Sequence, residues 1–357
     1  MKQKNVFALA GLAAAAALLS IGTILVQPRV ETSDRAGELV FPGLLDQVQQ
    51  NLKSVVIRHT GGTISLDRDG NVFRYRERAN YPADPQKVVD LVVDIARLTK
   101  LESKTNQSER YARLDLQEPT EKGSNAKQVT LIDSNGKEMA TLIVGKRKYT
   151  LGGKEGGTYV RLPGDPQTWL TLGEVNPGVV PRDWIAKDIV DVPDAAVKRV
   201  TITTAKGDRV IAARGADEKF VIENLQKNVT LESEFAAQEY SRIFAGLQAE
   251  DVAEAAQVPF PKDQTYSAVV ETVEGSTITV EMTEVNEKAW IKVAAQPAAG
   301  LAAESSAAQA MAGIKARGEG RVFQVPPYKV AIMKRTLADL RSRPAPNAPQ
   351  GPGVSLP

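Results

Sequence analysis

Two stretches of this chain share one order of predicted elements. The stretch "LKSVVIRHTGGTISLDRDGNVFRYRE" begins at Leu52, and "VKRVTITTAKGDRVIAARGADEKFVI" runs from Val197 to Ile222. In both, apolar and polar residues alternate along short segments separated by glycine-bearing turns, as in a meander of half-buried strands. Identity between the two halves is low, so the duplication is inferred from the order of the elements. This order predicts two similar modules.

Each predicted meander leads into a predicted helix and then into further strands. In the first half, Asp84 is a favourable N-cap and Pro85 a favourable first helical residue. The apolar residues that follow at helical spacing are Val88, Leu91, Val92, Ile95 and Leu98. In the second half, Ser233 is the predicted N-cap. The apolar face of that helix consists of Ala236, Tyr240, Ile243, Phe244 and Leu247. We therefore predict an α+β fold in which each module is an antiparallel meander sheet with a packed helix.

These patterns divide the chain into predicted parts. They are a cytoplasmic N-terminus at 1–5, a transmembrane anchor at 6–26, a stalk at 27–40, a first module at 41–182, a linker at 183–196, a second module at 197–343 and a disordered Pro-rich tail at 344–357. An Ala-rich insertion at 295–318 shows no strong apolar face. It is expected to be a surface helix or a mobile loop.

The N-terminal apolar run "VFALAGLAAAAALLSIGTILV" contains no charged residue and follows Lys2 and Lys4. About 20 apolar residues are enough to cross a bilayer as a helix. A cleaved signal peptide has a shorter apolar region and a small-x-small site after it. Here the run continues to Val26, and "QPRVETSDRAGE" follows without such a site, which favours an uncleaved anchor. The preceding lysines predict a cytoplasmic N-terminus, a single pass through the bacterial inner membrane and a periplasmic bulk.

Composition removes several classes of chemistry. The chain has no Cys, which excludes disulfides, thiolate metal sites and Cys nucleophiles, and its one histidine is His59. Lys and Arg number 45 against 43 Asp and Glu, with no basic stripe of the kind that nucleic-acid binding needs. We therefore expect no cofactor, no metal site and no nucleic-acid partner, and the sequence does not identify a small-molecule ligand.

Two short motifs resemble ligand loops. "LDRDGN" at 66–71 has part of a calcium loop, but the following residues alternate as a strand, so a hairpin turn is favoured. "LGGKEGGTY" at 151–159 lacks the spacing of a phosphate-binding loop and precedes a strand. Both are interpreted as turns or loops.

Four carboxylates lie close together in the linker region: Asp183, Asp188, Asp191 and Asp194. Two carboxylates that converge across a cleft could support a hydrolase acting on envelope glycan or peptide. The alternative, which we favour, is a short linker helix over Asp183–Asp191, whose acidic face is solvated while Trp184, Ile185 and Ile189 dock it. Asp194 is then a turn residue before the next strand. No catalytic residue is assigned.

A second group, at the centre of the chain, consists of Tyr159, Arg161, Trp169 and Trp184. Trp, Tyr and Arg are enriched at binding hot spots, and Trp is also a large core residue. We expect these residues to hold the two modules together at an inter-module seam. The alternative is that they contact a partner.

Several segments, in this order, resemble one known family. They are "LVFPGLLDQVQQNLKSVVI", "YPADPQKVVDLVVDIARL", "YARLDLQEP", "LIVGKRK", "GTYVRLPGDPQTWL", "DWIAKDIVDVP" and "VFQVPPYKVAIMKRTLADL". Together they are similar to the membrane-anchored envelope proteins of the domain of unknown function 4340 family. The Ala-rich insertion departs from this pattern. The resemblance implies a place beside gliding-type ABC transport components and carries over no catalytic residue.

The sequence thus predicts a non-enzymatic, membrane-anchored periplasmic accessory protein of an ABC-type transport or envelope complex. Its expected partners are the membrane, through the N-terminal helix, and a membrane protein complex. The alternatives are a periplasmic hydrolase that uses the linker carboxylates and a structural spacer.

Overall fold

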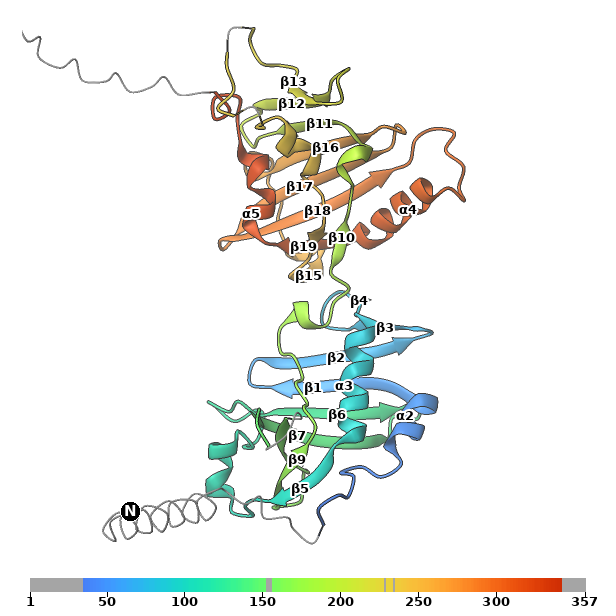
Figure 1. Ribbon diagram of the computed structural model, residues 1–357, viewed down its shortest axis with the longest axis vertical. Coiled ribbons are helices and arrows are strands. Elements are labelled where there is room, and N and C mark those ends of the chain that lie inside the picture. The colour runs from blue at the N-terminus through green and yellow to red at the C-terminus, as the bar shows by residue number, and fades with distance from the viewer. Residues whose placement is uncertain (1–34, 152–155, 228, 234, 342–357) are drawn as a thin grey trace, which may run out of the picture.

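The computed structural model describes residues 35–151, 156–227, 229–233 and 235–341. Two antiparallel sheets, each with its own helices, are stacked along the long axis of the molecule (Figure 1). The mixed helix and antiparallel-sheet class predicted from the sequence is confirmed. The predicted anchor at 6–26 and tail at 344–357 lie outside the described residues. Among the helices that the structure describes, none is long and apolar enough to cross a membrane.

The first sheet has the strand order β4-β3-β2-β1-β6-β7-β8-β9-β5. Its strands are β1 (Leu52–His59), β2 (Gly62–Asp69), β3 (Val72–Tyr75), β4 (Tyr81–Pro82), β5 (Thr99–Ser103), β6 (Lys127–Asp133), β7 (Glu138–Lys148), β8 (Gly157–Arg161) and β9 (Thr168–Leu172). Helices α2 (Leu44–Asn51) and α3 (Pro85–Arg97) pack on one face. On the other face, the β5–β6 connection closes a small separate core of Tyr111, Leu116, Ala126 and Ile143.

The second sheet has the strand order β13-β12-β11-β16-β17-β18-β19-β15. Its strands are β11 (Val197–Thr203), β12 (Arg209–Arg214), β13 (Phe220–Ile222), β15 (Asp251–Glu254), β16 (Tyr266–Thr272), β17 (Thr277–Val285), β18 (Lys288–Gln296) and β19 (Arg321–Val325). A separate pair consists of β10 (Asp188–Val190) and β14 (Leu247–Gln248). The helices are α4 (Ser306–Gly318) and α5 (Pro327–Val330).

The two strand orders correspond position by position. The meander β1-β2-β3 matches β11-β12-β13, and β6-β7-β8-β9-β5 matches β16-β17-β18-β19-β15. Strand β4 is the addition in the first sheet. In both sheets the alternating apolar residues, such as Val55 and Ile57 on β1 and Val200 and Ile202 on β11, point into the core.

Helix α3 follows the sequence closely. The side chain of Asp84 accepts hydrogen bonds from the backbone N–H groups of Gln86 (3.0 Å) and Lys87 (3.4 Å), and Pro85 is the first helical residue. The predicted apolar face, from Val88 to Ile95, is buried against the sheet. The cap and the apolar face together explain why a helix forms here.

The prediction of an α-helix after Ser233 is wrong. The structure has a 3-10 helix, Gln238–Arg242, between turns, and Leu247 belongs to β14. The predicted apolar side chains are nevertheless buried. A 3-10 helix rises about 2.0 Å per residue against about 1.5 Å for an α-helix, so the same few residues reach further towards β14.

The linker helix predicted over Asp183–Asp191 is also wrong. The chain forms a 3-10 turn, Pro181–Asp183, and then runs extended into β10. Its backbone pairs with the segment around β4: Ala186 N–H donates to Pro82 O (2.9 Å), and Asp84 N–H donates to Trp184 O (2.6 Å). These bonds satisfy the backbone in an extended form and leave no reason for a helix. We call residues 173–187 the strap.

Two other predicted segments differ in detail. The end of the predicted stalk lies along β5, because Gly37 N–H donates to Lys100 O (2.9 Å) and Val40 N–H donates to Leu98 O (2.8 Å). The Ala-rich insertion contains helix α4, which buries Met311 and Ile314. These are the two buried residues of α4, so the sequence of the helix shows no clear apolar face.

The tip of the β3–β4 hairpin joins the two modules. Tyr81 from β4 is fully buried, and its ring meets that of Phe323 on β19 edge to face at 5.5 Å. Arg78 donates to the carboxylate of Asp251, and Arg321 donates to Ala79 O (3.4 Å). The apolar core is continuous through this contact.

Candidate functional site

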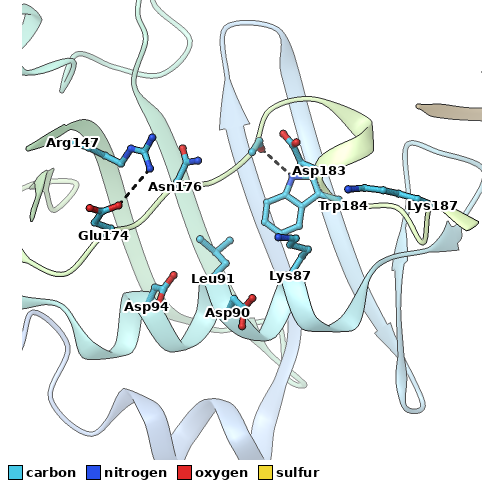
Figure 2. A pocket seen from close by; sticks show the side chains of 11 residues that line it. Lys87, Asp90, Leu91, Asp94, Arg147, Glu174, Asn176, Asp183, Trp184 and Lys187 are labelled. Atoms are coloured by element: carbon cyan, nitrogen blue, oxygen red, sulfur yellow. Dashed lines mark hydrogen bonds and ion pairs between the residues drawn. The ribbon is translucent and has the colours of Figure 1, made fainter. Parts of the chain in front are cut away.

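A polar groove of about 430 Å³ lies in the first module between α3 and the strap (Figure 2). Helix α3 supplies one wall, and the strap supplies the other. The lining residues are Lys87, Asp90, Leu91, Asp94, Arg147, Glu174, Asn176, Gly178, Asp183, Trp184 and Lys187. The groove therefore combines segments that are about 90 residues apart in the sequence.

Positive charge gathers at the end of the groove near Trp184, where Figure 2 shows Lys87 and Lys187. Lys87 is exposed on the first turns of α3, and Lys187 is half-buried at the end of the strap. Within the described ranges, the structure gives neither ammonium group a hydrogen bond or an ion pair. Both are therefore available to an acidic ligand group.

Negative charge gathers along α3 and at the other end, where Figure 2 shows Asp90, Asp94 and Glu174. Asp90 accepts a hydrogen bond from Gln86, and Glu174 pairs with Arg147 at 3.5 Å. Partial burial raises the pKa of the Asp94 carboxyl group, the nearby Asp90 raises it further, and Arg97 opposes the change. Asp94 would thus gain from a cationic partner.

Trp184, a predicted seam residue, lies in the wall of the groove. Its indole N–H donates to Gly178 O at 3.0 Å, and only 3% of the residue is exposed. A Cβ on Gly178 would collide with the Asp183 carboxylate, so the strap needs glycine for this close turn. Trp184 also accepts the bond from Asp84 beside β4, which places it close to the junction of the modules.

The other three predicted seam residues lie elsewhere, so the sequence grouping is corrected. Tyr159 and Arg161 are on β8 and Trp169 is on β9, near the edge of the sheet that is remote from β4 and the second module. Nothing in the strand pattern revealed which edge faces the second module.

These three residues have local contacts within the first module, and Tyr159 packs against the small core that contains Tyr111 and Leu116. Arg161 donates to Leu116 O (3.2 Å) and to Glu118 (2.6 Å), and its guanidinium lies 4.7 Å from the centre of the Tyr111 ring. Trp169 is 7% exposed, and the Lys100 ammonium lies 5.2 Å from its ring centre. Arg161 thus holds the β5–β6 connection against the sheet, and Trp169 contacts the edge strand β5 through Lys100.

The linker carboxylates do not converge. Asp183 lines the groove, whereas Asp188 accepts a bond from Gln248 (2.9 Å) and Asp191 accepts one from Gly246 N–H (2.9 Å). Asp194 belongs to a different cluster in the second module. The condition for the hydrolase hypothesis, two of these side chains facing one cleft, is not met.

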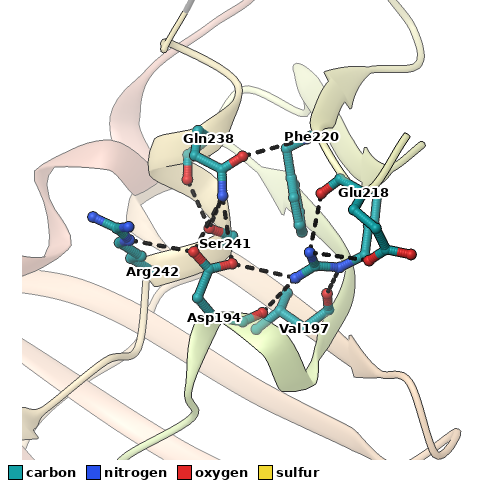
Figure 3. Close-up of polar contacts among 8 residues, drawn as sticks. Asp194, Val197, Glu218, Phe220, Gln238, Ser241 and Arg242 are labelled. Carbon is teal, nitrogen blue, oxygen red and sulfur yellow. Dashed lines mark hydrogen bonds and ion pairs between the residues drawn. The ribbon is translucent and has the colours of Figure 1, made fainter. Parts of the chain in front are cut away.

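Asp194 is the centre of a hydrogen-bonded cluster (Figure 3). It accepts from Arg214 (3.2 Å), Gln238 (3.1 Å) and Arg242 (3.3 Å). Burial opposes ionisation of its carboxyl group, but hydrogen bonds from Ser241, Arg242, Arg214 and Gln238 outweigh burial and lower the pKa. The cluster ties the start of β11 to the 3-10 helix and has a structural role.

The remaining motifs have local explanations. Residues 66–71 contain the β2–β3 hairpin turn, with Gly70 at a φ of 61°. Part of the "LGGKEGGTY" loop, residues 152–155, lies outside the described residues. His59 Nδ1 accepts a bond from Gly61 N–H (3.1 Å), and burial together with Lys127 lowers the pKa of the imidazole. Within the part of the chain that the structure describes, no group of His, Asp and Glu could hold a metal ion.

Sequence reasoning missed the groove residues Lys87, Asp94, Asn176 and Lys187. Lys87 and Asp94 are seven residues apart and so lie on one side of α3, which the helical period could have indicated. The strap residues gave no such signal, because their position depends on backbone pairing with β4.

Comparisons with known proteins are consistent with this picture but add no activity. A family model described as a domain of unknown function (DUF4340) matches residues 74–267, more than half of the chain. The match runs from β3 to β16 and so includes the strap and the β3–β4 hairpin tip, whereas Arg321 and Phe323 on the other side of the junction lie outside it. No curated protein and no solved structure matches the chain.

Proposed function

The chain belongs to the DUF4340 family, and we propose that it is a non-enzymatic, membrane-anchored periplasmic accessory protein of an ABC-type transport or envelope complex. In this proposal, residues 6–26 hold the protein in the inner membrane by a single pass. The groove of the first module binds part of a partner.

One observation carries this proposal: the described chain begins at the edge of the molecule that is remote from the second module. Residues 37–40 lie beside β5, and β5 is the strand furthest from β4 in the first sheet. Figure 1 shows the second module beyond β4 at the opposite end of the long axis. An anchor that precedes residue 35 would place the first module and its groove near the membrane and the second module away from it.

The disposition of the carboxylates supports a binding role over the hydrolase alternative. Asp188, Asp191 and Asp194 are each held by partners in separate structural contacts. The groove, by contrast, presents charged groups without protein partners, which suits recognition of another molecule.

Single-cysteine crosslinking in the full-length chain tests this proposal, because the chain has no cysteine of its own. Asn176→Cys places a thiol in the groove, and Val221→Cys places one on the exposed edge strand of the second module. A membrane-impermeant maleimide should label both positions from the periplasmic side. A thiol crosslinker applied to membranes should then join Asn176→Cys to a membrane protein.

The control is the same pair of variants with Leu18→Arg and Leu19→Arg, which should prevent membrane insertion. Loss of the crosslinked product in this background is the expected result. A protein that stays in membranes and yields no crosslinked membrane partner from either position would contradict the accessory role.

A further inference from the structure

The lysines and carboxylates of the groove that are unpaired among the described residues lie in different places along it, and this distribution of charge indicates which kind of ligand it binds. We propose that it binds a short, extended peptide segment in the polyproline II conformation, which carries a carboxylate and a cationic group about 10 Å apart on one side. This inference deepens the binding role proposed above, and it does not depend on the anchor or on the ABC-type complex.

The spacing of charges on α3 sets the length of the ligand. Lys87 and Asp94 both line the groove and are seven residues apart. At about 1.5 Å per residue, they are roughly 10 Å apart along the helix axis. A peptide in the polyproline II conformation advances about 3.1 Å per residue with three residues per turn, so side chains three residues apart lie on the same side and cover about this distance.

The distribution of charge sets the ligand's two ends. Lys87 and Lys187 have no partner among the described residues, and they would receive the carboxylate. Asp94 is likewise without a hydrogen bond or ion pair in the described part, and together with Asp90 it would receive the cation. Two other charges of the lining lie at the ends of opposite sign: Arg147 pairs with Glu174 at the acidic end, and the Asp183 carboxylate, beside Trp184, accepts from Val180 N–H (3.4 Å).

The strap supplies groups that match a peptide backbone. Neither the side-chain amide of Asn176 nor the backbone N–H groups of Asn176 and Gly178 form a hydrogen bond within the described residues. The strap is extended here and runs opposite α3. A ligand backbone in the polyproline II conformation makes no internal hydrogen bonds, so its carbonyl groups are free to accept bonds from these donors.

The apolar part of the groove disfavours a glycan. Leu91 is 4% exposed and Trp184 is 3% exposed, and the Trp184 indole N–H is already bonded to Gly178 O. The ring therefore presents little open face on which a sugar could stack. Charges of both signs with free backbone donors fit a peptide better.

Tryptophan indole signals give a site-specific test in the full-length protein. The chain has three Trp residues, and Trp184 lines the groove, whereas Trp169 and Trp290 do not. We would record indole N–H signals of the ¹⁵N-labelled protein in detergent micelles and assign Trp184 with Trp184→Phe. The probe is the capped tetrapeptide Lys-Ala-Ala-Asp. The controls are Lys-Ala-Ala-Lys, Asp-Ala-Ala-Asp and Gln-Ala-Ala-Asn.

The expected result is a saturable shift of the Trp184 signal with Lys-Ala-Ala-Asp, weaker effects with the controls, and no change at Trp169 or Trp290. The double variant Lys87→Glu, Lys187→Glu should weaken binding of Lys-Ala-Ala-Asp about five- to tenfold. It should also bind Lys-Ala-Ala-Lys more tightly, because Arg147, which pairs with Glu174, is then the one basic side chain left among the described lining residues. The matched control Lys198→Glu, Lys206→Glu, which changes exposed lysines of the second module, should leave binding unchanged.

Two outcomes would overturn the inference: no saturable Trp184 shift with the mixed-charge peptide, or a shift equally strong with the neutral peptide. Either result leaves the accessory role standing if crosslinking still recovers a membrane partner. Conversely, peptide binding without any membrane partner would support this inference and remove the proposed function.

Discussion

The two modules share their strand order but cover their sheets differently. In the first, a 13-residue α-helix is capped by Asp84 and packs on the sheet beside the strap. In the second, a five-residue 3-10 helix occupies the corresponding place in the chain order, and the cluster around Asp194 holds it. The first arrangement leaves a groove with free charges, whereas in the second the polar side chains bond to one another.

The two modules therefore differ in the layer that covers the sheet and not in the sheet itself. The alternating apolar residues determine which face of each sheet is buried, and a shift of register would turn these side chains to the solvent. The layer that covers the sheet is less constrained. In the function proposed above, the first module carries the binding surface and the second is a compact support.

The largest expected effect comes from breaking the contact between the modules. Tyr81→Ala should reduce the free energy of unfolding by about 3–5 kcal/mol, because it empties a fully buried site against Phe323. Chemical denaturation followed by tryptophan fluorescence would measure this loss, and it should separate the unfolding of the two modules.

Tyr81→Phe is the matched control. Burial raises the pKa of the Tyr81 phenol to about 12, and its hydroxyl has no hydrogen-bond partner in the described structure. Removing that hydroxyl should leave stability unchanged or raise it slightly. A loss as large as that of Tyr81→Ala would mean that the hydroxyl, and not the ring, holds the modules together.

The next prediction concerns the hydrogen-bonded cluster around Asp194 in the second module. Asp194→Ala should cost about 2 kcal/mol, because Arg214 and Gln238 lose an acceptor in a partly buried site. The low pKa of Asp194 means that its contribution is fully present above the ordinary carboxyl pKa and is lost as the pH falls through the lower folded-state value. Acid unfolding curves of the wild type and Asp194→Asn should therefore converge as the pH falls below the ordinary carboxyl pKa of about 3.9. Curves that stay parallel throughout the acid range would contradict this role.

A smaller effect is expected at the cap of α3 in the first module. Asp84→Ala should destabilise the protein by about 1 kcal/mol, since two backbone N–H groups lose their acceptor. Amide hydrogen exchange should show the loss first in the opening turn of α3. Asp84→Ser should retain most of the stability because serine is also a good N-cap, and a loss equal to that of alanine would exclude capping as the reason.

The smallest effect concerns the hairpin tip at the junction. Ala79 and Asn80 have φ values of 53° and 49°, a region that alanine rarely adopts. Ala79→Gly should stabilise the protein by about 0.5–1 kcal/mol, measured as an increase in Tm. Asn80→Gly should change the Tm less, because asparagine tolerates this conformation. Destabilisation by Ala79→Gly would show that the turn is not strained.

The strands and α3 were predictable because their signals are local. Alternation placed Val55, Ile57, Val200 and Ile202 in the core, and Asp84 with Pro85 marked the start of α3. The strap and the 3-10 helix were not predictable in this way, because pairing between distant segments decides their form. For the same reason the grouping of Tyr159, Arg161 and Trp169 with Trp184 was wrong. Sequence proximity did not reveal that β8 and β9 lie at the remote edge.

The position of the chain ends gives the hairpin tip a mechanical consequence. The described chain begins beside β5 in the first module, and it ends at Arg341, which bridges to Leu231 beyond β13 in the second. A force applied between these two ends acts on both sheets and on the connection between them. This connection consists of the tip around Tyr81 and the extended strap. The tip contacts the second module through the Tyr81–Phe323 ring contact and the hydrogen bonds of Arg78 and Arg321. Under tension the first event would be withdrawal of this tip, which lengthens the molecule while both sheets stay folded.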